Sequence, residues 1–343
     1  MRGSPEKLLH TTKHKTGFIV CQLVFLLFYY FMIFLIMADL NISIFSPAKI
    51  NLFLKVKERR PDGFHNIDSF FLALDFGDTL HFEVVPYKNT VEIMMEGLNY
   101  ELPIEKNIIF KAISLFRKKT GLVQGLKVRV KKRIPIGGGL GGGSSNAAST
   151  LLALNRLNDN PLSRDTLLEM ATCLGSDVSF FVYETTAAWV TGRGEKIEPC
   201  GAEVDTSVVF VLVNPGFPSD TAAAYKLLDE SRFEMVSKTF LRIPDSHDID
   251  NAFRLLETYR IKSELDFAVN DFMFVFKDTE KTVYDRIISE LKKHGAVSAG
   301  LSGTGSTCFG LFTEGKQAEE AAGRLRGKWG FAEAVAAKIT DKQ

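Results

Sequence analysis

The chain has 343 residues, which is enough for two domains or one large domain and leaves ample material for a hydrophobic core. Its 41 acidic and 42 basic residues nearly balance, and no extended basic run indicates a nucleic-acid-binding surface. The four cysteines lie far apart and form no Cys-x-x-Cys pair, so neither a zinc site nor a disulfide framework is indicated. This composition suits a reducing compartment, and we expect a cytoplasmic protein.

The first 36 residues differ in character from the rest. Residues 1–16 are polar and basic, whereas 17–37 are almost wholly apolar and reach the length of about 20 residues that a transmembrane helix needs. The apolar stretch is too long for a signal-peptide core and carries no Ala-x-Ala cleavage site. We favour the interpretation that Met37 is the true start and that 1–36 is an over-extended gene prediction. A genuine membrane anchor is the alternative.

From residue 38 onward the sequence predicts strands and helices of an ordinary globular protein. The expected strands are 42–56, as two strands or one bent at Ser46-Pro47, then 79–85, 126–132, 187–191, 207–213 and 307–312, with a further apolar run at 67–74. The expected helices are 107–120, 147–154, 163–174, 221–230, 250–258, 279–294 and 316–326. Polar and turn residues at Pro199-Cys200-Gly201 predict a boundary between an N-terminal domain, 37–200, and a C-terminal domain, 201–343.

Residues 135–148 form a glycine-rich loop, Pro-Ile-Gly-Gly-Gly-Leu-Gly-Gly-Gly-Ser-Ser-Asn-Ala-Ala, that leads into a helix. Glycine loses more backbone entropy on folding than other residues, so such a cluster indicates positive φ angles or close approach to a ligand. Ser144, Ser145 and Asn146 are good N-cap residues, and a helix N-terminus after a glycine loop is an anion site. The loop is not Gly-x-x-x-x-Gly-Lys-Ser/Thr, because no lysine precedes Ser144. We expect it to bind a polyphosphate.

Four further polar clusters stand out, namely Lys49 with Asn51, Gly63-Phe64-His65, Ser176-Asp177 and residues 302–306. Phosphoryl transfer requires a phosphate cradle, a cationic group for the transition state and a carboxylate that takes the acceptor's proton. Taken singly, each cluster has an ordinary structural explanation, such as a strand-edge lysine, a turn aspartate or a surface histidine. Their occurrence together predicts a phosphotransferase site.

These segments resemble the three motifs of the GHMP small-molecule kinase superfamily. The matching stretches are, in order along the chain, Ser46–Leu52, Pro135–Ala148, Leu174–Val178 and Leu301–Ser306. The resemblance covers about residue 40 to the C-terminus. It implies a two-domain α+β fold, with the glycine loop in the N-terminal domain and an α/β sandwich-like C-terminal domain that closes over the substrate.

The resemblance also implies residue roles and cofactors. Asp177 would be the base, and Lys49 its cationic neighbour, which stabilises the developing alkoxide. ATP with Mg²⁺ would be used, although the sequence identifies no metal ligands. The ATP phosphates would be held by Pro135, Ile136, Gly137, Gly138, Gly139, Leu140, Gly141, Gly142, Gly143, Ser144 and Ser145. The loop from the second domain would contribute Gly303, Thr304, Gly305 and Ser306.

Within the superfamily, the turn Arg60-Pro61-Asp62-Gly63-Phe64-His65 resembles that of members with a cytidyl substrate. Those members phosphorylate the 2-hydroxyl of 4-diphosphocytidyl-2-C-methyl-D-erythritol in the non-mevalonate route to isoprenoid precursors. The resemblance implies that Asn51, Phe64, His65 and Tyr225 bind the substrate. Phe64 replaces a tyrosine frequent in the family and retains the ring face for stacking.

Two other functions remain open from the sequence. One is a related kinase for a mevalonate-type or homoserine-type acceptor, against which the Gly-Phe-His turn argues, because it suits a nucleobase better than a small acid. The other is a membrane-anchored nucleotide-binding protein without turnover, against which the presence of both Lys49 and Asp177 argues.

Overall fold

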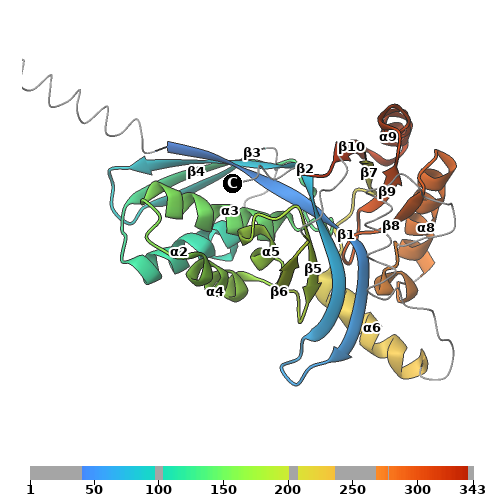
Figure 1. Cartoon of the computed structure of the whole chain (residues 1–343), viewed down its shortest axis with the longest axis horizontal. Helices are drawn as coiled ribbons and strands as arrows, with labels where there is room; N and C mark the ends of the chain where they lie inside the picture. Colours follow the sequence, from blue (N-terminus) through green and yellow to red (C-terminus); the bar gives the residue numbers. More distant parts are fainter. Residues whose placement is uncertain (1–40, 97–102, 201–207, 236–267, 277, 339–343) are drawn as a thin grey trace, which may run out of the picture.

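The computed structural model describes residues 41–96, 103–200, 208–235, 268–276 and 278–338. Two β-sheets organise these residues (Figure 1). The N-terminal sheet has the strand order β3-β4-β2-β5-β6, with β1 paired to β2, and the C-terminal sheet has the order β10-β7-β9-β8. The apolar stretch 17–37 and the expected helix 250–258 lie outside the described residues.

The N-terminal part contains six strands and four helices within the described ranges. The strands are β1 (Asn41–Arg59), β2 (His65–Val85), β3 (Val91–Glu96), β4 (Gly125–Lys131), β5 (Ala187–Thr191) and β6 (Lys196–Pro199). The helices are α2 (Ile108–Thr120), α3 (Gly142–Leu157), α4 (Arg164–Leu174) and α5 (Val178–Val182), preceded by the 3₁₀ turn η1 (Ile104–Lys106). All four helices cover one face of the sheet (Figure 1).

The C-terminal part is a four-stranded antiparallel sheet with helices packed on it. Its strands are β7 (Val209–Asn214), β8 (Ser298–Leu301), β9 (Cys308–Phe312) and β10 (Phe331–Ala336). Helices α8 (Asp278–Lys293) and α9 (Gly315–Trp329) pack on this sheet, whereas α6 (Thr221–Met235) contacts the 3₁₀ turn η2 (Asp271–Phe274). Helix α6 lies beside the protruding β1–β2 hairpin in Figure 1, which brings the two parts of the chain together there.

Strand β1 connects the two halves through its alternating faces. Ala48, Ile50 and Leu52 are buried in an apolar cluster with residues of the C-terminal sheet such as Phe210 and Phe309. Because successive side chains of a strand point to opposite sides, Lys49 and Asn51 share the other face. Register shifts against β2 flank this segment, between Pro47 and Lys49 and between Asn51 and Phe53, so the expected bend is one bulged strand.

Most predicted helices form close to their expected limits. Asn107 caps α2, since its side chain accepts a hydrogen bond from the Ile109 amide at 3.0 Å, and Gly121 ends the helix with φ 76°. Ser163 caps α4 by accepting from the Thr166 amide. Helix α3 differs, because it begins at Gly142 with Gly141 as N-cap. The prediction that Ser144 to Asn146 are the N-cap is therefore wrong, and these residues form the first helical turn.

Several short elements were not expected from the sequence, namely β3, β6, β8, β10 and α5. The run 67–74 and the strand 79–85 instead belong to one long strand, β2, which pairs along its length with β1. The predicted domain boundary stays a prediction, since residues 201–207 lie outside the described ranges.

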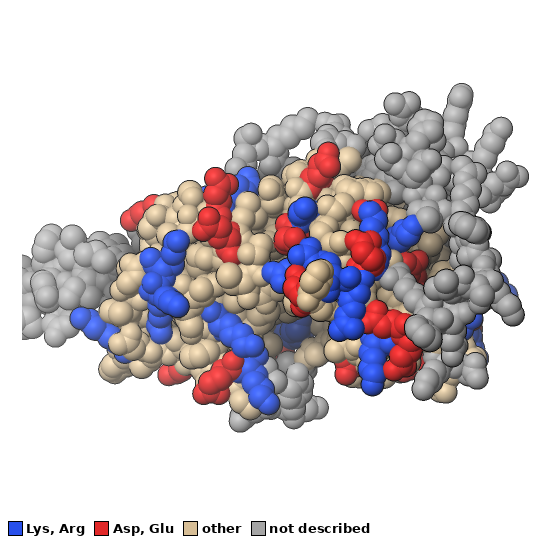
Figure 2. All heavy atoms as spheres, turned by 90° about the horizontal axis from the view of Figure 1, so that it is seen from below, with Lys and Arg blue, Asp and Glu red and all other residues tan. Residues whose placement is uncertain are grey.

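The face of the molecule in Figure 2 has mixed charge. On this face, lysine and arginine side chains alternate with aspartate and glutamate. Among the described residues, no helix is long and apolar enough to cross a bilayer.

Candidate active site

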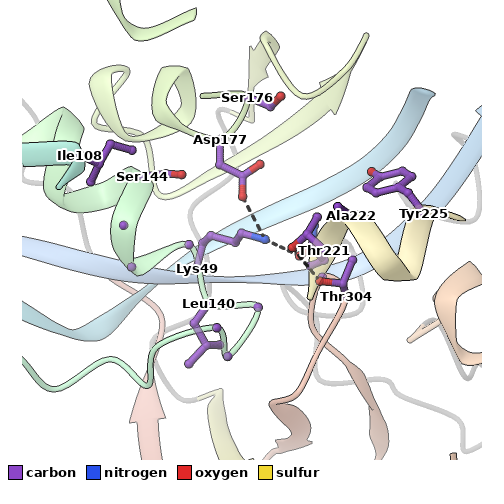
Figure 3. Close-up of a pocket in the computed structure, with 18 of the residues that line it drawn as sticks. Lys49, Ile108, Leu140, Ser144, Ser176, Asp177, Thr221, Ala222, Tyr225 and Thr304 are labelled. Carbon is purple, nitrogen blue, oxygen red and sulfur yellow. Dashed lines mark hydrogen bonds and ion pairs between the residues drawn. The ribbon is translucent and has the colours of Figure 1, made fainter. Parts of the chain in front are cut away.

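A cavity of about 1190 Å³ lies between the two halves of the chain. The N-terminal part contributes the glycine loop, Lys49, Asp177 and the turn around Phe64, and the C-terminal part contributes α6 and the loop at Gly303. Figure 3 shows Lys49 and Asp177 pointing toward one another, between the segment that carries Leu140 and Ser144 and helix α6 with Thr221 and Tyr225. The fold therefore brings the separate sequence motifs to one place.

Lys49 is a buried cation at the centre of this cavity. Its Nζ lies 3.4 Å from Asp177 Oδ2 and 2.5 Å from Asn51 Oδ1, and it lies 4.6 Å from the centre of the Phe71 ring. Only 4% of the Lys49 side chain is exposed. Burial lowers the pKa of Lys49 below the ordinary lysine value, and the Asp177 carboxylate only partly offsets this. The Lys49 amine therefore lies where water screens it little, with the Asp177 carboxylate as its neighbouring charge.

Asp177 stands at the N-cap position of α5 but does not cap it. Its side chain makes no hydrogen bond to the helix amides, and its carboxylate faces Lys49 instead. The side chain is 29% exposed, so it reaches the open space of the cavity. An aspartate that is held by a neighbouring cation and open to a ligand suits proton acceptance.

Five consecutive carbonyl groups of the glycine loop, those of residues 137–141, point into the protein, because each accepts a hydrogen bond from it. The donor and acceptor pairs are Ser219 N to Gly137 O (2.9 Å), Thr307 N to Gly138 O (3.1 Å), Ser302 Oγ to Gly139 O (2.9 Å), Lys49 N to Leu140 O (3.0 Å) and Ser145 N to Gly141 O (2.8 Å). Consecutive carbonyls that are turned inward leave the loop's amides on the cavity side.

The loop amides are available to a ligand. Within the described part of the chain, the N–H groups from Gly139 to Ser144 donate to no protein acceptor. Buried amides are almost always paired, so a row of unpaired amides beside a helix N-terminus is typical of a site for phosphate oxygens. Gly139 and Gly141 have φ angles of 74° and 68°, which explains the need for glycine there.

An ion pair anchors the strand that leads into the loop. Lys132 Nζ contacts Asp78 Oδ2, and Asp78 Oδ1 accepts hydrogen bonds from the Arg133 and Ile134 amides at 2.8 and 2.9 Å. Asp78 is fully buried, and burial lowers the pKa of Lys132. Lys132 lines the cavity beside Gly142, so the Lys132–Asp78 ion pair lies next to the loop.

The other end of the cavity is aromatic. Phe64 is 49% exposed, with the Arg193 guanidinium 5.0 Å from its ring centre. His65 is buried and stacks on Tyr225, with ring centres 5.1 Å apart and 22° between the planes. Tyr225 itself meets Phe272 edge-on at 5.0 Å. These rings offer flat apolar surface to a planar ligand group.

Not every residue expected at the site lines the cavity. Ser145 is fully buried, with its hydroxyl 2.8 Å from Ser46 Oγ. Gly303 and Thr304 line the cavity, whereas Gly305 and Ser306 lie behind them, and Ser306 Oγ donates to the Phe217 carbonyl. All other residues expected to bind ATP or substrate are in the lining.

Several lining residues were not singled out from the sequence, and they include Arg59, Lys106, Lys132, Arg193, Thr221 and Asp229. Lys132 carried a local signal, because it stands directly before the loop within Lys131-Lys132-Arg133. Arg193 and Asp229 carried none, since they come from a hairpin turn and a helix that no motif marks.

A divalent metal would find few protein ligands here. Among the described residues, no group of three or more histidine, cysteine, aspartate or glutamate side chains is arranged to hold a metal ion. Asp177 and the Ser144 hydroxyl are among the oxygen donors near the loop. Such a sparse set fits Mg²⁺, which usually binds through one or two carboxylates plus substrate phosphates and water.

Two segments match family models of known kinases. Residues 107–185 match the model of the GHMP kinases N terminal domain, and residues 277–330 match that of the GHMP kinases C terminal domain. With the two-sheet α+β fold, these matches define the protein as a GHMP kinase. The superfamily resemblance and the fold class predicted from the sequence are confirmed.

Relatives narrow this class to one family. 4-Diphosphocytidyl-2-C-methyl-D-erythritol kinase of Thermodesulfovibrio yellowstonii is 37% identical over 296 residues, which cover 82% of this chain and 93% of that protein. The chloroplastic enzyme of that name from Oryza sativa is 36% identical over 275 residues, covering 79% of this chain and 64% of the rice protein. The chain therefore belongs to the 4-diphosphocytidyl-2-C-methyl-D-erythritol kinase family.

Solved structures agree with this assignment. A crystal structure of 4-(cytidine 5'-diphospho)-2C-methyl-D-erythritol kinase matches with a TM-score of 0.68 and 27% identity, covering 87% of this chain and all of that one. The mevalonate kinase of L. major has a similar TM-score of 0.67 but only 16% identity, covering 88% of this chain and 97% of that one, so it shows the shared fold alone.

Proposed function

We propose that this chain transfers the γ-phosphoryl group of ATP to the 2-hydroxyl of 4-diphosphocytidyl-2-C-methyl-D-erythritol. The observation that supports this most is the Lys49–Asp177 pair, which lies in one cavity with the unpaired amides of the glycine loop and with the aromatic group around His65. The three parts correspond to the acceptor hydroxyl, the polyphosphate and the nucleobase. The identity of the substrate is assigned from family membership.

Asp177 accepts the proton of the acceptor hydroxyl in this proposal. The substrate oxygen forms a bond to the γ-phosphorus, the bond from that phosphorus to the β,γ-bridging oxygen breaks, and ADP leaves. Positioned general bases contribute about 10²- to 10⁴-fold to rate. Because the Asp177 carboxylate is not used as a helix cap, it is available for this role.

Lys49 stabilises the negative charge that develops on the attacking oxygen. Asn51 Oδ1 and Asp177 hold its ammonium from two sides, so the cation is oriented before the substrate arrives. Preorganised charge in a site with little water acts more strongly than the same charge in solvent. Its burial among Asn51, Asp177 and Phe71 supports this role.

The loop from Pro135 to Ser144 holds the ATP phosphates in this proposal. Its inward carbonyls and cavity-facing amides suit phosphate oxygens, and the Lys132–Asp78 ion pair lies beside it. Gly303 and Thr304 close the cavity from the C-terminal domain. Ser145, Gly305 and Ser306 support these segments from behind. Mg²⁺ would be held by the phosphates with Asp177 or Ser144 and would neutralise phosphate charge during transfer.

The cytidine binds at the aromatic end of the cavity. Phe64 and Tyr225 provide ring faces for the base, and His65 provides polar contact to its edge. Asn51, next to Lys49 on the same face of β1, lies near the position of the acceptor hydroxyl. In this arrangement the bound base anchors one end of the substrate, and the diphosphate extends from it toward the Lys49–Asp177 pair.

A coupled assay of ADP release tests the proposal. The protein is supplied with ATP and Mg²⁺ and with 4-diphosphocytidyl-2-C-methyl-D-erythritol, mevalonate or homoserine as the acceptor. We expect rapid ADP release with the cytidyl substrate and only background with the other two. Turnover of mevalonate or homoserine at a higher kcat/KM would replace the proposal with the related-kinase alternative.

A further inference from the structure

Asp229 has no role in the motifs, yet it is bound to a buried histidine of the base-binding end. His65 Nε2 lies 2.7 Å from Asp229 Oδ1, although 164 positions separate the two residues in the sequence. The His65 side chain is 4% exposed and that of Asp229 is 32% exposed. His65 begins β2, whereas Asp229 lies on α6, so the contact joins the two halves of the chain across the cavity that both line.

The chemistry of this contact determines which ring nitrogen of His65 is protonated. An ionised carboxylate has no hydrogen to donate, so Nε2 must be the donor and must carry a proton. In a neutral ring the other nitrogen, Nδ1, is then an acceptor. Among the described residues, Nδ1 of His65 has no hydrogen-bond partner. The pair therefore leaves one unsatisfied acceptor at the base-binding end of the cavity.

Neighbouring groups hold the pair in place. Tyr225 stands four residues before Asp229 on α6, so both side chains lie on one face of that helix. The Tyr225 ring stacks on His65, and Arg59 Nη1 lies 3.7 Å from the second oxygen of Asp229. Stacking fixes the ring plane and the hydrogen bond fixes its rotation about Cβ–Cγ.

We propose that Asp229 is a positioning residue of the substrate site, which holds His65 in the Nε2–H tautomer and presents Nδ1 as a hydrogen-bond acceptor. The inference rests on the proposed function, since the ligand that it would recognise is the cytosine of the substrate. Cytosine carries an exocyclic amine, which donates, at the position where uracil carries a carbonyl oxygen, which accepts. An acceptor at Nδ1 pairs with the amine and repels the carbonyl.

The first test compares substrate preference in variants of Asp229. Asp229→Ala removes the acceptor, and Asp229→Asn replaces it with an amide that offers either an oxygen or an NH₂ group to Nε2. We expect kcat/KM for the cytidyl substrate to fall about 2- to 13-fold, mainly through KM, with KM for ATP unchanged. The preference for the cytidyl substrate over its uridyl analogue should narrow by a similar factor.

Glu230→Gln is the matched control. It removes a carboxylate from the adjacent position of α6, where Glu230 pairs with Lys226 at 3.9 Å and does not line the cavity. We expect it to leave both the cytidyl KM and the base preference unchanged. A general weakening of α6 would alter the ATP KM and the thermal midpoint, but would not alter the preference for one base selectively.

The second test reads the tautomer directly and needs no turnover. Long-range ¹H–¹⁵N NMR of the histidine rings identifies the protonated nitrogen, and the His65 signal is the one that is missing in His65→Gln. We expect the Nε2–H form in the wild-type protein and its loss in Asp229→Ala. A wild-type His65 in the Nδ1–H form overturns the inference, as does an unchanged base preference in an active Asp229→Ala. Failure of the wild-type protein to use the cytidyl substrate counts against the proposed function instead.

Discussion

The backbone amide of Lys49 donates a hydrogen bond to the Leu140 carbonyl in the glycine loop, with 3.0 Å between nitrogen and oxygen. The strand that carries the buried lysine therefore also holds the centre of the loop. Because this link is made by backbone atoms, the separation between the loop and the Lys49–Asp177 pair does not depend on a flexible side chain. A substitution that displaces one of the two segments should therefore displace the other.

Asp177→Asn should remove turnover and leave nucleotide binding largely intact. The substitution deletes the proton acceptor but no part of the glycine loop, and we expect kcat to fall about 10²- to 10⁴-fold. Steady-state kinetics and binding of a non-hydrolysable ATP analogue measure the two effects. Asp165→Asn, at an exposed aspartate of α4, is the matched control and should be silent. More than about a third of the wild-type kcat in Asp177→Asn would contradict the assignment of the base.

Two glycine substitutions separate the stability of the loop from its binding role. Gly139→Ala places Cβ 2.1 Å from the Ser302 carbonyl oxygen at a φ of +74°, so we expect it to destabilise the protein by about 1–3 kcal/mol.

Gly143→Ala meets no atom closer than Ile108 Cγ2 at 4.0 Å and lies in the first turn of α3, so the fold should gain about 0.5–1 kcal/mol. Its methyl group lies beside the loop amides, and we expect a higher KM for ATP. Thermal unfolding and ATP kinetics check both variants. A Gly143→Ala protein with unchanged ATP affinity would argue against phosphate binding at the loop.

The activity should decline on the alkaline side at a pH below the ordinary lysine value of 10.5, because burial lowers the pKa of Lys49. Raising the pH through that lowered pKa removes the charge that the transition state needs, so kcat falls. The free energy of unfolding should change in the opposite direction and rise over this pH range. Between the lowered pKa and 10.5 the unfolded state binds more protons than the folded state, so the contribution of Lys49 to stability rises with pH.

The kcat–pH profile and denaturant unfolding at several pH values measure these two trends, with Lys49→Met as the reference for stability. Lys57→Met changes a half-buried lysine on the same strand, paired with Asp68 outside the cavity, and should keep the wild-type profile. An alkaline limb at or above 10.5 would show that Lys49 is not the titrating group.

Phe64→Ala should weaken binding of the cytidyl substrate and leave binding of ATP unchanged. Base stacking on an aromatic side chain contributes about 1–3 kcal/mol, which corresponds to an increase in KM of about 5- to 150-fold. Phe64→Tyr keeps the ring face and should be nearly silent. If Phe64→Ala instead raised the KM for ATP alone, the turn would belong to the nucleotide-donor site.

A protein that begins at Met37 should keep its activity, because every residue of the candidate site lies downstream of that position. Expression of this shortened chain and comparison of its kcat and thermal midpoint with those of the full chain provide the test. Loss of folding in the shortened chain, or recovery of the native full-length chain in the membrane fraction with a peptide from residues 1–16, would support the anchor interpretation.

The sequence predicted the parts of the site that have a local signature. The glycine loop, Lys49 and Asp177 occur within short motifs whose chemistry is readable from residue type and spacing. The sequence pattern predicted too late a start for α3, because glycine is a poor helix former and Ser144 is a good cap. In the structure the helix begins at Gly142. Asp229 was not predictable, since only the docking of α6 brings it to His65.

The elements missed in the fold have a similar explanation. Strands β8 and β10 contain glycine and alanine at positions where a sheet usually has branched side chains, so their local preference for strand is weak. They form because pairing with β9 and β7 satisfies their backbone. Long-range pairing of this kind leaves little trace in a local pattern.

The most direct test of the account is the ³¹P NMR spectrum of the product formed from ATP and 4-diphosphocytidyl-2-C-methyl-D-erythritol. We expect a new phosphomonoester resonance, with carbon–phosphorus coupling at C2 of the substrate. The cytidyl diphosphate signals should stay intact, and one ADP should form for each monoester. The wild-type protein should form it, and Asp177→Asn should not. A spectrum without the monoester, or one in which the cytidyl diphosphate is cleaved instead, would contradict the account.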